Sequence, residues 1–359
     1  MTKIITVVGA RPQFVKAAAL SRALKKIGIE EILVHTGQHF DENMAEIFFR
    51  QMAIPQPKYN LGINSLSHGA MTGRMLEEIE KVIIEEKPSV LVVFGDTNST
   101  LAGALAASKL HIPVAHIEAG LRSFNMKMPE EVNRILTDRI SEYLFCPNEN
   151  AIVNLKKEGF ENFGCQIMNC GDVMYDVALY YSQFSAQHST IISELKLEPG
   201  KFLLTTLHRQ ENTDDPAILE SLIFTLNELS GKYKIVLPIH PRTRKIIESR
   251  GLKLNFNPID PVGYFDMIEL LKHCAFVISD SGGLQKEAFF FEKHCLVIRN
   301  ETEWTELVEM GYNFLTGTKS DKILETVDKL ADYKMQFDKK PYGEGNAAEK
   351  IALVLKNIN

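Results

Sequence analysis

Residues 90–100 read Val90-Leu91-Val92-Val93-Phe94-Gly95-Asp96-Thr97-Asn98-Ser99-Thr100, and this stretch decides the fold class. Five apolar residues in a row predict a strand that is buried on both faces, as in a parallel sheet. A glycine and a carboxylate follow, and the next segment, Ser99–Leu110, predicts a helix. The carboxyl ends of parallel strands face the crevice in which ligands bind. We therefore expect Asp96 to lie at a functional crevice.

The same alternation of strand and helix runs through the whole chain in two series. Strands are expected at Ile4–Val8, Ile32–His35, Val90–Phe94, Val114–Ile117 and Tyr143–Phe145, then at Phe202–Thr206, Ile235–Pro238, Phe276–Ser279 and Cys295–Ile298. This pattern predicts an α/β protein with two Rossmann-like domains and the active site in the cleft between them. We place the first domain at residues 1–170, the second at 171–342 and a final helix at 343–359. The polar stretch Ser182–Ser193 is expected to lead into the second series.

Length and composition exclude several classes of protein. A chain of 359 residues is expected to form two domains, and its 45% hydrophobic and 24% charged residues are ordinary for a globular protein. The net charge of −6, with scattered basic residues, argues against a nucleic-acid or membrane surface. There is no signal-peptide pattern and no apolar run near the roughly 20 residues that span a bilayer, so a cytoplasmic location is expected. The five cysteines have no metal-binding or disulfide framework spacing.

Carboxylates gather at three places in the first series. Asp96 and Glu118 each follow an apolar run directly, and Glu130 begins the expected helix Glu130–Ile140. Carboxylates that share one crevice repel each other, so the pKa of at least one of them should rise. Such a group is suited to removing and replacing protons.

Two glycine-containing turns are candidate anion sites. Arg11 and Lys16 follow the first strand and suit a diphosphate or a carboxylate, although a plain turn with solvated basic residues remains equally open. After the strand Phe276–Ser279, the hydroxyl of Ser281 and the glycine Gly282 precede a helix, which favours phosphate binding over a simple helix cap. Glu287 on that helix is placed to accept hydrogen bonds from ribose hydroxyls.

Two histidines follow successive strands of the second series. His208 and His240 occupy equivalent places in their β-α units, and either can be a polar loop residue or a group that handles protons near neutral pH. His35 and His39 have i,i+4 spacing, but Gly37 between them indicates a loop rather than a metal-binding helix.

Taken in order, these segments resemble the non-hydrolysing UDP-N-acetylglucosamine 2-epimerase family along nearly the whole chain. The matching segments are Gly9–Lys16, His35–His39, Gly95–Thr100, His116–Arg122, Pro129–Arg134, His208–Asn212 and Asp280–Ala288. The resemblance implies two Rossmann-like domains of the glycosyltransferase-B type, with the final helix crossing back onto the first domain. It also implies a homodimer that binds a UDP-sugar and UDP and uses no metal or nicotinamide cofactor.

The chemistry that the resemblance implies begins with removal of the C2 proton of the sugar and anti elimination of UDP. A 2-acetamidoglucal remains, and UDP then adds back while a proton arrives at the opposite face of C2. By motif, the acid–base candidates are Asp96, Glu118 and Glu130, and His208, Arg11 and Lys16 steady the diphosphate. UDP is expected to contact His240, Ser281, Gly282 and Glu287. Gln38, His39 and Arg74 match segments that serve regulation in some members of the family.

Departures from the parent pattern indicate the substrate. The connection Ser123–Met128 is short, and Trp304 stands where an arginine is usual. These variants are similar to the branch that acts on UDP-2,3-diacetamido-2,3-dideoxyglucuronate, whose 3-acetamido group and C6 carboxylate would need apolar surface and a cation. Trp304 with Lys127 or Arg122 could supply them. UDP-N-acetylglucosamine remains the alternative substrate. A glycosyltransferase of the same fold and a catalytically silent nucleotide-sugar sensor remain alternatives of other classes.

Overall fold

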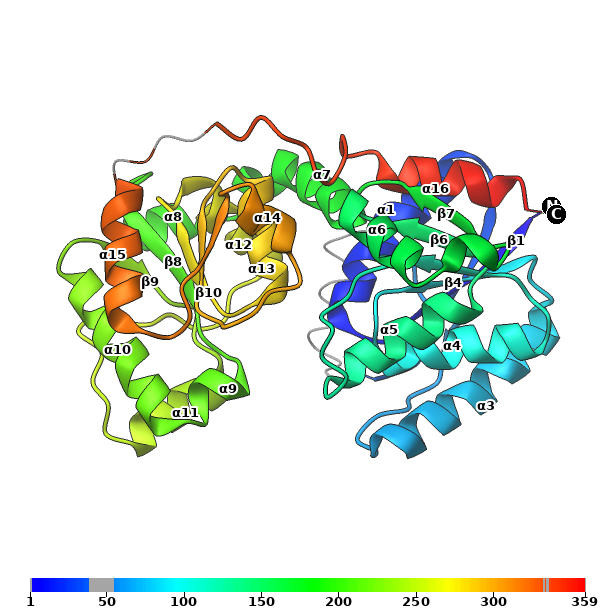
Figure 1. Ribbon diagram of the computed structural model, residues 1–359, viewed down its shortest axis with the longest axis horizontal. Coiled ribbons are helices and arrows are strands. Elements are labelled where there is room, and N and C mark those ends of the chain that lie inside the picture. The colour runs from blue at the N-terminus through cyan, green and yellow to red at the C-terminus, as the bar shows by residue number, and fades with distance from the viewer. Residues whose placement is uncertain (1, 39–54, 332, 334–335, 359) are drawn as a thin grey trace. The chain divides into compact units, whose positions relative to one another are not determined.

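The computed structural model describes residues 2–38, 55–331, 333 and 336–358. The chain forms two compact units, one of residues 1–177 with 340–359 and the other of residues 178–339. Each unit is a parallel sheet flanked by helices (Figure 1). The expected α/β class with two Rossmann-like domains is therefore confirmed.

The strands of the first unit pair in the order β3-β2-β1-β4-β5-β6-β7, all parallel. They are β1 (Lys3–Val8), β2 (Glu30–His35), β3 (Tyr59–Asn60), β4 (Val90–Phe94), β5 (Val114–Ile117), β6 (Tyr143–Cys146) and β7 (Gln166–Asn169). All five residues of β4 are fully buried, as the unbroken apolar run predicts. The short strands β3 and β7 carry polar residues, and neither was among the strands expected from the sequence.

Helices cover both faces of this first sheet. They are α1 (Arg11–Lys26), α3 (His68–Glu86), α4 (Asn98–Lys109), α5 (Pro129–Ile140), α6 (Glu149–Lys157) and α16 (Ala347–Lys356). The helix α7 (Val173–His188) begins in this unit and continues into the second. Figure 1 shows α1 and α16 on one side and α3, α4 and α5 on the other. Met75 and Ile79 of α3 pack with the alanines of α4 against Val7 and Val93 of the sheet.

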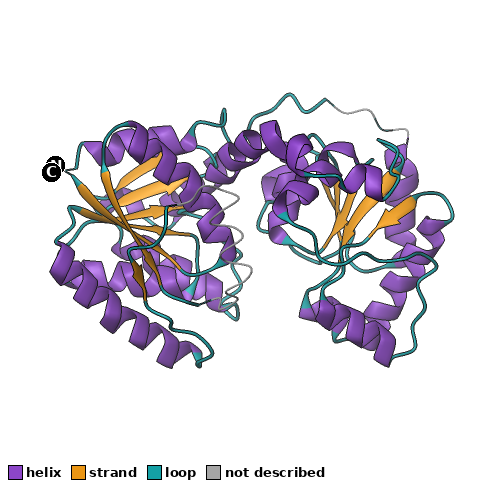
Figure 2. Cartoon of the chain, turned by 180° about the vertical axis from the view of Figure 1, so that it is seen from behind, coloured by secondary structure: helices purple, strands orange, loops and turns teal. Residues whose placement is uncertain are grey.

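The second unit has the strand order β12-β11-β10-β8-β9, again all parallel (Figure 2). Its strands are β8 (Phe202–Thr206), β9 (Lys234–Val236), β10 (Val277–Ser279), β11 (Cys295–Val297) and β12 (Asn313–Leu315). Its helices are α8 (Ile191–Glu194), α9 (Gln210–Thr213), α10 (Pro216–Ser230), α11 (Pro241–Ser249), α12 (Tyr264–His273), α13 (Gly282–Phe290), α14 (Thr305–Glu309) and α15 (Ser320–Ala331).

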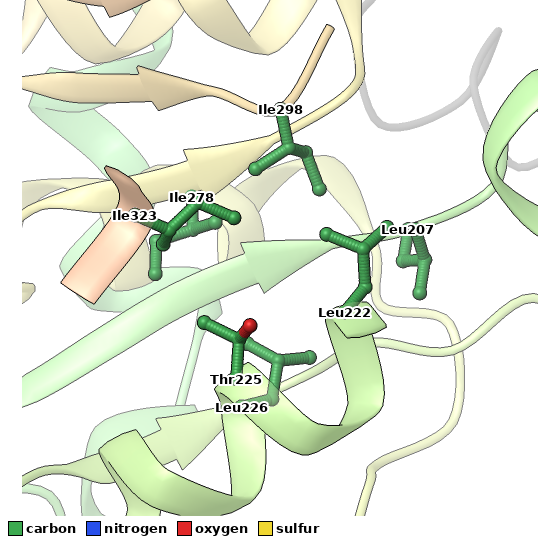
Figure 3. A pocket seen from close by; sticks show the side chains of 7 residues that line it. All are labelled: Leu207, Leu222, Thr225, Leu226, Ile278, Ile298 and Ile323. Carbon is green, nitrogen blue, oxygen red and sulfur yellow. The ribbon is translucent and has the colours of Figure 1, made fainter. Parts of the chain in front are cut away.

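Alternate residues of the second sheet face two separate apolar clusters. Leu203 and Ile278 pack toward α10 and α15, whereas Leu204 and Val277 pack toward α12 and α13. Strand side chains alternate between the two faces of a sheet, so these strands must be apolar on both. The first cluster leaves a small apolar void of about 10 Å³ (Figure 3), lined by Leu207, Leu222, Thr225, Leu226, Ile278, Ile298 and Ile323.

The chain passes between the units inside a helix. The units divide at Val177, which lies within α7. The stretch Ser182–Ser193, which we expected to be a polar connection, is largely helical, because α7 continues to His188 and α8 begins at Ile191. The final helix α16 belongs to the first unit, where it packs against α1. The Asp176 carboxylate accepts hydrogen bonds from the backbone N–H groups of Ala347 (3.1 Å) and Ala348 (2.7 Å) and so caps this helix. No helix in the described part of the chain is long and apolar enough to cross a membrane.

Candidate active site

Each sheet has two neighbouring strands whose outgoing connections run in opposite directions along the sheet. Residues predicted from the sequence to belong to the site follow these strands. In the first unit the two strands are β1 and β4, followed by Gly9 and Asp96. In the second unit they are β8 and β10, followed by His208 and Ser281. Ligands of open α/β sheets bind outside the carboxyl ends of two such strands. Each unit thus carries one group of candidate residues.

Glu118 and Lys16 form an ion pair in the first unit. The Lys16 ammonium donates to Oε2 of Glu118, and the two side chains are only 11% and 7% exposed. Glu118 has a φ of +69°, in the left-handed region that costs a non-glycine residue of order 1–2 kcal/mol. Its N–H and that of Ala119 both donate to the carbonyl of Phe145 on β6, which holds the turn. Strain of this kind, held by its surroundings, is typical of functional positions.

Asp96 lies beside this pair and forms an ion pair of its own. Nη2 of Arg134 on α5 donates to the Asp96 carboxylate at 2.6 Å. Burial raises the pKa of the Asp96 carboxyl above its ordinary value, and the negative charges of Glu118 and Glu130 add to this effect. Arg134 and Lys16 act in the opposite direction. The crowding of carboxylates that the sequence indicates is therefore present around Asp96.

The adjacent glutamates of α5 have different surroundings. Glu130 is exposed on the first turn of the helix, whereas Glu131 is fully buried. Glu131 accepts hydrogen bonds from the N–H and hydroxyl groups of Ser123 (2.9 and 3.0 Å) and from the N–H of Phe124 (2.9 Å). It thereby anchors the short connection Ser123–Met128. Glu131 was not predicted from the sequence, because its neighbours come from a loop whose path the sequence does not reveal.

Gln13 is a second residue that sequence reasoning missed. Its side-chain oxygen accepts from the N–H groups of Gly9 (2.8 Å) and Ala10 (3.0 Å), and its nitrogen donates to the carbonyl of Phe94 at 2.8 Å. It therefore ties the turn after β1 to the turn after β4. Gly9 itself has no room for a side chain, because an added Cβ would lie 2.0 Å from the Ser99 hydroxyl.

The expected anion and regulatory residues of the first unit are placed as follows. Arg11 begins α1, but its side chain is outside the described part of the structure. The side-chain oxygen of Gln38 accepts hydrogen bonds from the hydroxyl (2.7 Å) and N–H (3.1 Å) of Ser99 at the start of α4. Arg74 is exposed on α3, and His39 lies outside the described residues.

In the second unit, Ser281 caps the helix α13. Its hydroxyl accepts a hydrogen bond from the N–H of Leu284 at 3.4 Å, so the helix-cap function is present. Gly282 and Gly283 form the first turn of the helix, and nothing within 4 Å would meet a side chain added at Gly283. A Cβ added at Gly282 would lie 3.6 Å from the Glu303 carboxylate and 3.9 Å from the Arg209 guanidinium, so both charged groups lie beside the start of this helix. Glu287 is half-buried one turn further along.

Asp280 organises the turn that carries His208. Its buried carboxylate accepts from the N–H groups of His208 and Arg209 (both 2.9 Å) and from the amide of Asn212 at 3.3 Å. Its other oxygen lies 3.3 Å from Nδ1 of His208, whose side chain is 47% exposed. Asp280 therefore fixes the backbone of the turn that carries His208, and its second oxygen lies within ion-pairing distance of the imidazole. His240 instead caps α11, where its Nδ1 accepts from the N–H of Arg242 at 3.2 Å.

Two residues that we expected to contact the substrate are otherwise engaged. The Arg122 side chain is fully buried and donates to Asp138 and Glu158, at 2.7 and 2.8 Å, so of the two alternative cations for a substrate carboxylate it is the one already engaged. Trp304 is 7% exposed, and its indole N–H donates to the carbonyl of Gly282 at 2.8 Å. Trp304 therefore supports the glycine turn from behind. Lys127 is exposed and remains available as a cation.

Comparison with known proteins identifies the family. The model of the UDP-N-acetylglucosamine 2-epimerase family matches residues 22–356. The chain belongs to this family. A UDP-2,3-diacetamido-2,3-dideoxy-D-glucuronate 2-epimerase from Pseudomonas aeruginosa is 56% identical over 99% of this chain and 100% of its own. The resemblance stated from the motifs is thus confirmed.

Solved structures of the epimerase family share the whole fold. The Methanocaldococcus jannaschii UDP-GlcNAc 2-epimerase in complex with UDP-GlcNAc and UDP is 42% identical, with a TM-score of 0.88 over 99% of both chains. The MnaA–UDP structure from S. aureus is 33% identical, with a TM-score of 0.87 over 99% of this chain and 96% of its own. A glycosyltransferase from Rickettsia africae, at 14% identity and a TM-score of 0.60, shares the fold alone.

Proposed function

We propose that this chain is a non-hydrolysing 2-epimerase that inverts C2 of UDP-2,3-diacetamido-2,3-dideoxyglucuronate for surface polysaccharide precursors. The observation that carries the reaction class is the pair of ion-paired carboxylates at the end of β4 and β5, Asp96 with Arg134 and Glu118 with Lys16. The substrate is supported by the full-length identity of 56% to the Pseudomonas aeruginosa enzyme of that name. The glycosyltransferase alternative is supported by likeness of fold only.

The two carboxylates are suited to opposite halves of a proton exchange. Lys16 stabilises the ionised form of Glu118, which makes Glu118 our candidate for the base that removes the C2 proton. Burial favours the protonated form of Asp96, which makes it our candidate for the acid that returns a proton to the opposite face. In the first step the C2–H electron pair forms the C1–C2 double bond and the C1–O bond breaks, releasing UDP. In the second step a UDP oxygen attacks C1 while C2 is protonated. Glu130, exposed beside them, remains a third acid–base candidate.

The second unit supplies most of the groups that we assign to UDP. The first turn of α13, with Ser281 and Gly282, is our candidate for the diphosphate, because bare N–H groups at a helix start bind phosphate oxygens. His208, on the turn that Asp280 holds, is our candidate for steadying the departing diphosphate. Glu287 and His240 complete the proposed contacts to the nucleotide. Arg11 is retained as a proposed diphosphate contact on its motif alone.

The proposed substrate differs from UDP-N-acetylglucosamine by a second acetamido group and a carboxylate at C6. Lys127 is our candidate partner for that carboxylate, because Arg122 is committed to Asp138 and Glu158. Lys127 stands on the short connection that Glu131 anchors. A homodimer is part of the proposal and rests on the family resemblance, and light scattering of the purified chain tests it.

The decisive experiment follows the C2 hydrogen. The protein is incubated in D₂O with each of the two UDP-sugars, and C2 is monitored by NMR. Epimerised product with deuterium at C2 is expected, first and fastest with the diacetamido glucuronate. Product that keeps its original hydrogen would contradict the elimination route. Consumption of UDP-sugar only when a sugar acceptor is added would instead favour the glycosyltransferase.

A further inference from the structure

A buried charged cluster lies beneath the turns that carry Asp96 and Glu118, and the proposed mechanism assigns it no chemistry. Its members are His116 on β5, Asp138 on α5 and Arg122, whose side chains are all completely buried. Glu158 closes the cluster from its edge with a side chain that is 33% exposed. Burying charged groups costs free energy unless each is paired and hydrogen-bonded, so such a cluster needs a structural or functional reason.

Asp138 is the centre of this cluster. It accepts hydrogen bonds from Nδ1 of His116 (2.6 Å), the N–H of Gly120 (3.1 Å) and Nη1 of Arg122 (2.7 Å). Burial alone would raise the pKa of Asp138, but the charges and hydrogen bonds of His116 and Arg122 outweigh it and hold that pKa below its ordinary value. All three partners are donors, so the site requires an acceptor on both carboxylate oxygens.

His116 extends the cluster to the neighbouring strand end. Its Nε2 donates to the carbonyl of Gly95 at 2.7 Å, and Gly95 immediately precedes Asp96. Through Gly120, Asp138 also holds the turn that follows Glu118. Both turns have left-handed backbone, with φ of +61° at Gly95 and +69° at Glu118. Glycine adopts this conformation without strain, whereas at Glu118 it persists only when the surroundings hold it.

We propose that Asp138 is a positioning residue that sets the separation of Asp96 and Glu118 by holding His116 and Gly120. The proposal rests on the proposed function, since it concerns proton transfer at C2 of the sugar. Proton transfer needs the donor and acceptor within about 2.6–3.2 Å, and a misplacement of about 1 Å can cost about 10²-fold in rate. The hydrogen bonds of Asp138 go to His116, Gly120 and Arg122, so it acts on the two carboxylates through the backbone of their turns.

The test compares Asp138→Asn with Glu158→Gln. Asparagine keeps the size of the side chain, but its NH₂ group faces a donor, either His116 or Gly120 with Arg122. The hydrogen bond to that donor is lost, so the turn that it holds is released. Glu158 accepts from Arg122 at 2.7 and 2.8 Å at the far edge of the cluster from Gly95, so it is the matched control. We expect Asp138→Asn to lower kcat by about 10- to 100-fold with KM and UDP affinity within about threefold of wild type. Glu158→Gln should lower the melting temperature while kcat stays within about twofold.

A second pair of variants separates the two links of His116 and covers the case in which Asp138→Asn fails to fold. Glutamine places an N–H group near the position of Nε2 and can keep the bond to Gly95, whereas asparagine places one near Nδ1 and cannot. His116→Gln should therefore keep several-fold more kcat than His116→Asn at a similar melting temperature. Equal kcat for the two, or a Glu158→Gln variant as slow as Asp138→Asn, would overturn the inference. A wild-type chain that leaves C2 unlabelled in D₂O would overturn the proposed function instead.

Discussion

At the scale of single residues, the site depends on which carboxylate each cation reaches. Lys16 reaches Glu118 and Arg134 reaches Asp96, so two carboxylates at neighbouring strand ends receive different partners. Two carboxylates whose surroundings differ can divide acid and base functions between them. The adjacent residues Glu130 and Glu131 also differ in their surroundings: Glu130 is exposed, whereas Glu131 is buried and anchors a loop.

The first prediction concerns these carboxylates. Asp96→Asn and Glu118→Gln should each lower kcat on the order of 10²–10⁴-fold, the usual loss of a general acid or base. UDP affinity, measured by calorimetry, should change little, because neither carboxylate is among the residues that we assign to UDP. Ser281→Ala is the opposite control and should weaken UDP binding. Near-normal turnover of either carboxylate variant would show that the site is assigned incorrectly.

At the scale of elements, Asp176 caps the final helix with a carboxylate that is largely removed from water. Burial raises the pKa of Asp176 to about 6, in spite of the hydrogen bonds from Ala347 and Ala348 that oppose the shift. A carboxyl whose pKa is higher in the folded than in the unfolded chain, where it is about 3.9, binds its proton more tightly when folded. The folded state therefore loses stability from this group as the pH rises from about 4 to 6, and the loss persists above pH 6.

The second prediction is that Asp176→Asn flattens this pH dependence. A folded pKa that exceeds the unfolded pKa by about 2 corresponds to at most about 2–3 kcal/mol, so the variant should gain stability relative to wild type as the pH rises from about 4.5 to 7. Burial lowers the pKa of His35 to about 4, which gives the opposite trend in the same window. The contribution of His35 is the same in both proteins, so it cancels in the difference between their free energies of unfolding. Urea denaturation at several pH values measures it, and a difference that does not vary with pH would contradict the prediction.

The third prediction concerns the helix α10 and the void in Figure 3. Leu226 is 4% exposed and lines the void, so Leu226→Ala enlarges a space that is already imperfectly filled. A loss of about 2–5 kcal/mol in the free energy of unfolding is expected. Phe224, on the same helix, is 56% exposed and is the matched control, because Phe224→Ala removes little buried area. Equal losses for the two variants by denaturant titration would contradict this account of the core.

At the scale of the whole molecule, the fourth prediction concerns substrate choice. We expect efficient epimerisation of the diacetamido glucuronate and little of UDP-N-acetylglucosamine, because a site built for a carboxylate leaves its cation unpaired with the neutral sugar. Lys127→Ala should lower kcat/KM for the acidic sugar while the residual activity on UDP-N-acetylglucosamine is retained. Similar kcat/KM for both sugars in the wild type would contradict the substrate assignment and leave the epimerase assignment intact.

Much of the fold was predictable from local sequence. The strands β4, β5 and β8 have the predicted bounds, because a short, mainly apolar or β-branched run followed within two residues by a glycine, a carboxylate or a histidine is a local signal. The strands β3, β7 and β12 were missed, since they are short, lie at or near sheet edges and carry polar residues. The helix α7 was missed for a related reason: the stretch from Ser182 onward is polar in composition, but buried residues such as Tyr181 and Ser185 anchor that helix.

The sequence by itself determined the α/β class, the family and the position of Asp96, Glu118, His208 and Ser281 at strand ends. Those features are properties of short segments and of their order along the chain. Only the tertiary structure decided that Arg122 is buried with Asp138, that Asp280 holds the turn of His208 and that Glu131 anchors a loop. The partners in these contacts are 8 to 72 residues apart. Charge and hydrogen bonding act over a few ångströms, so the chemistry of each side chain follows from neighbours that folding brings to it.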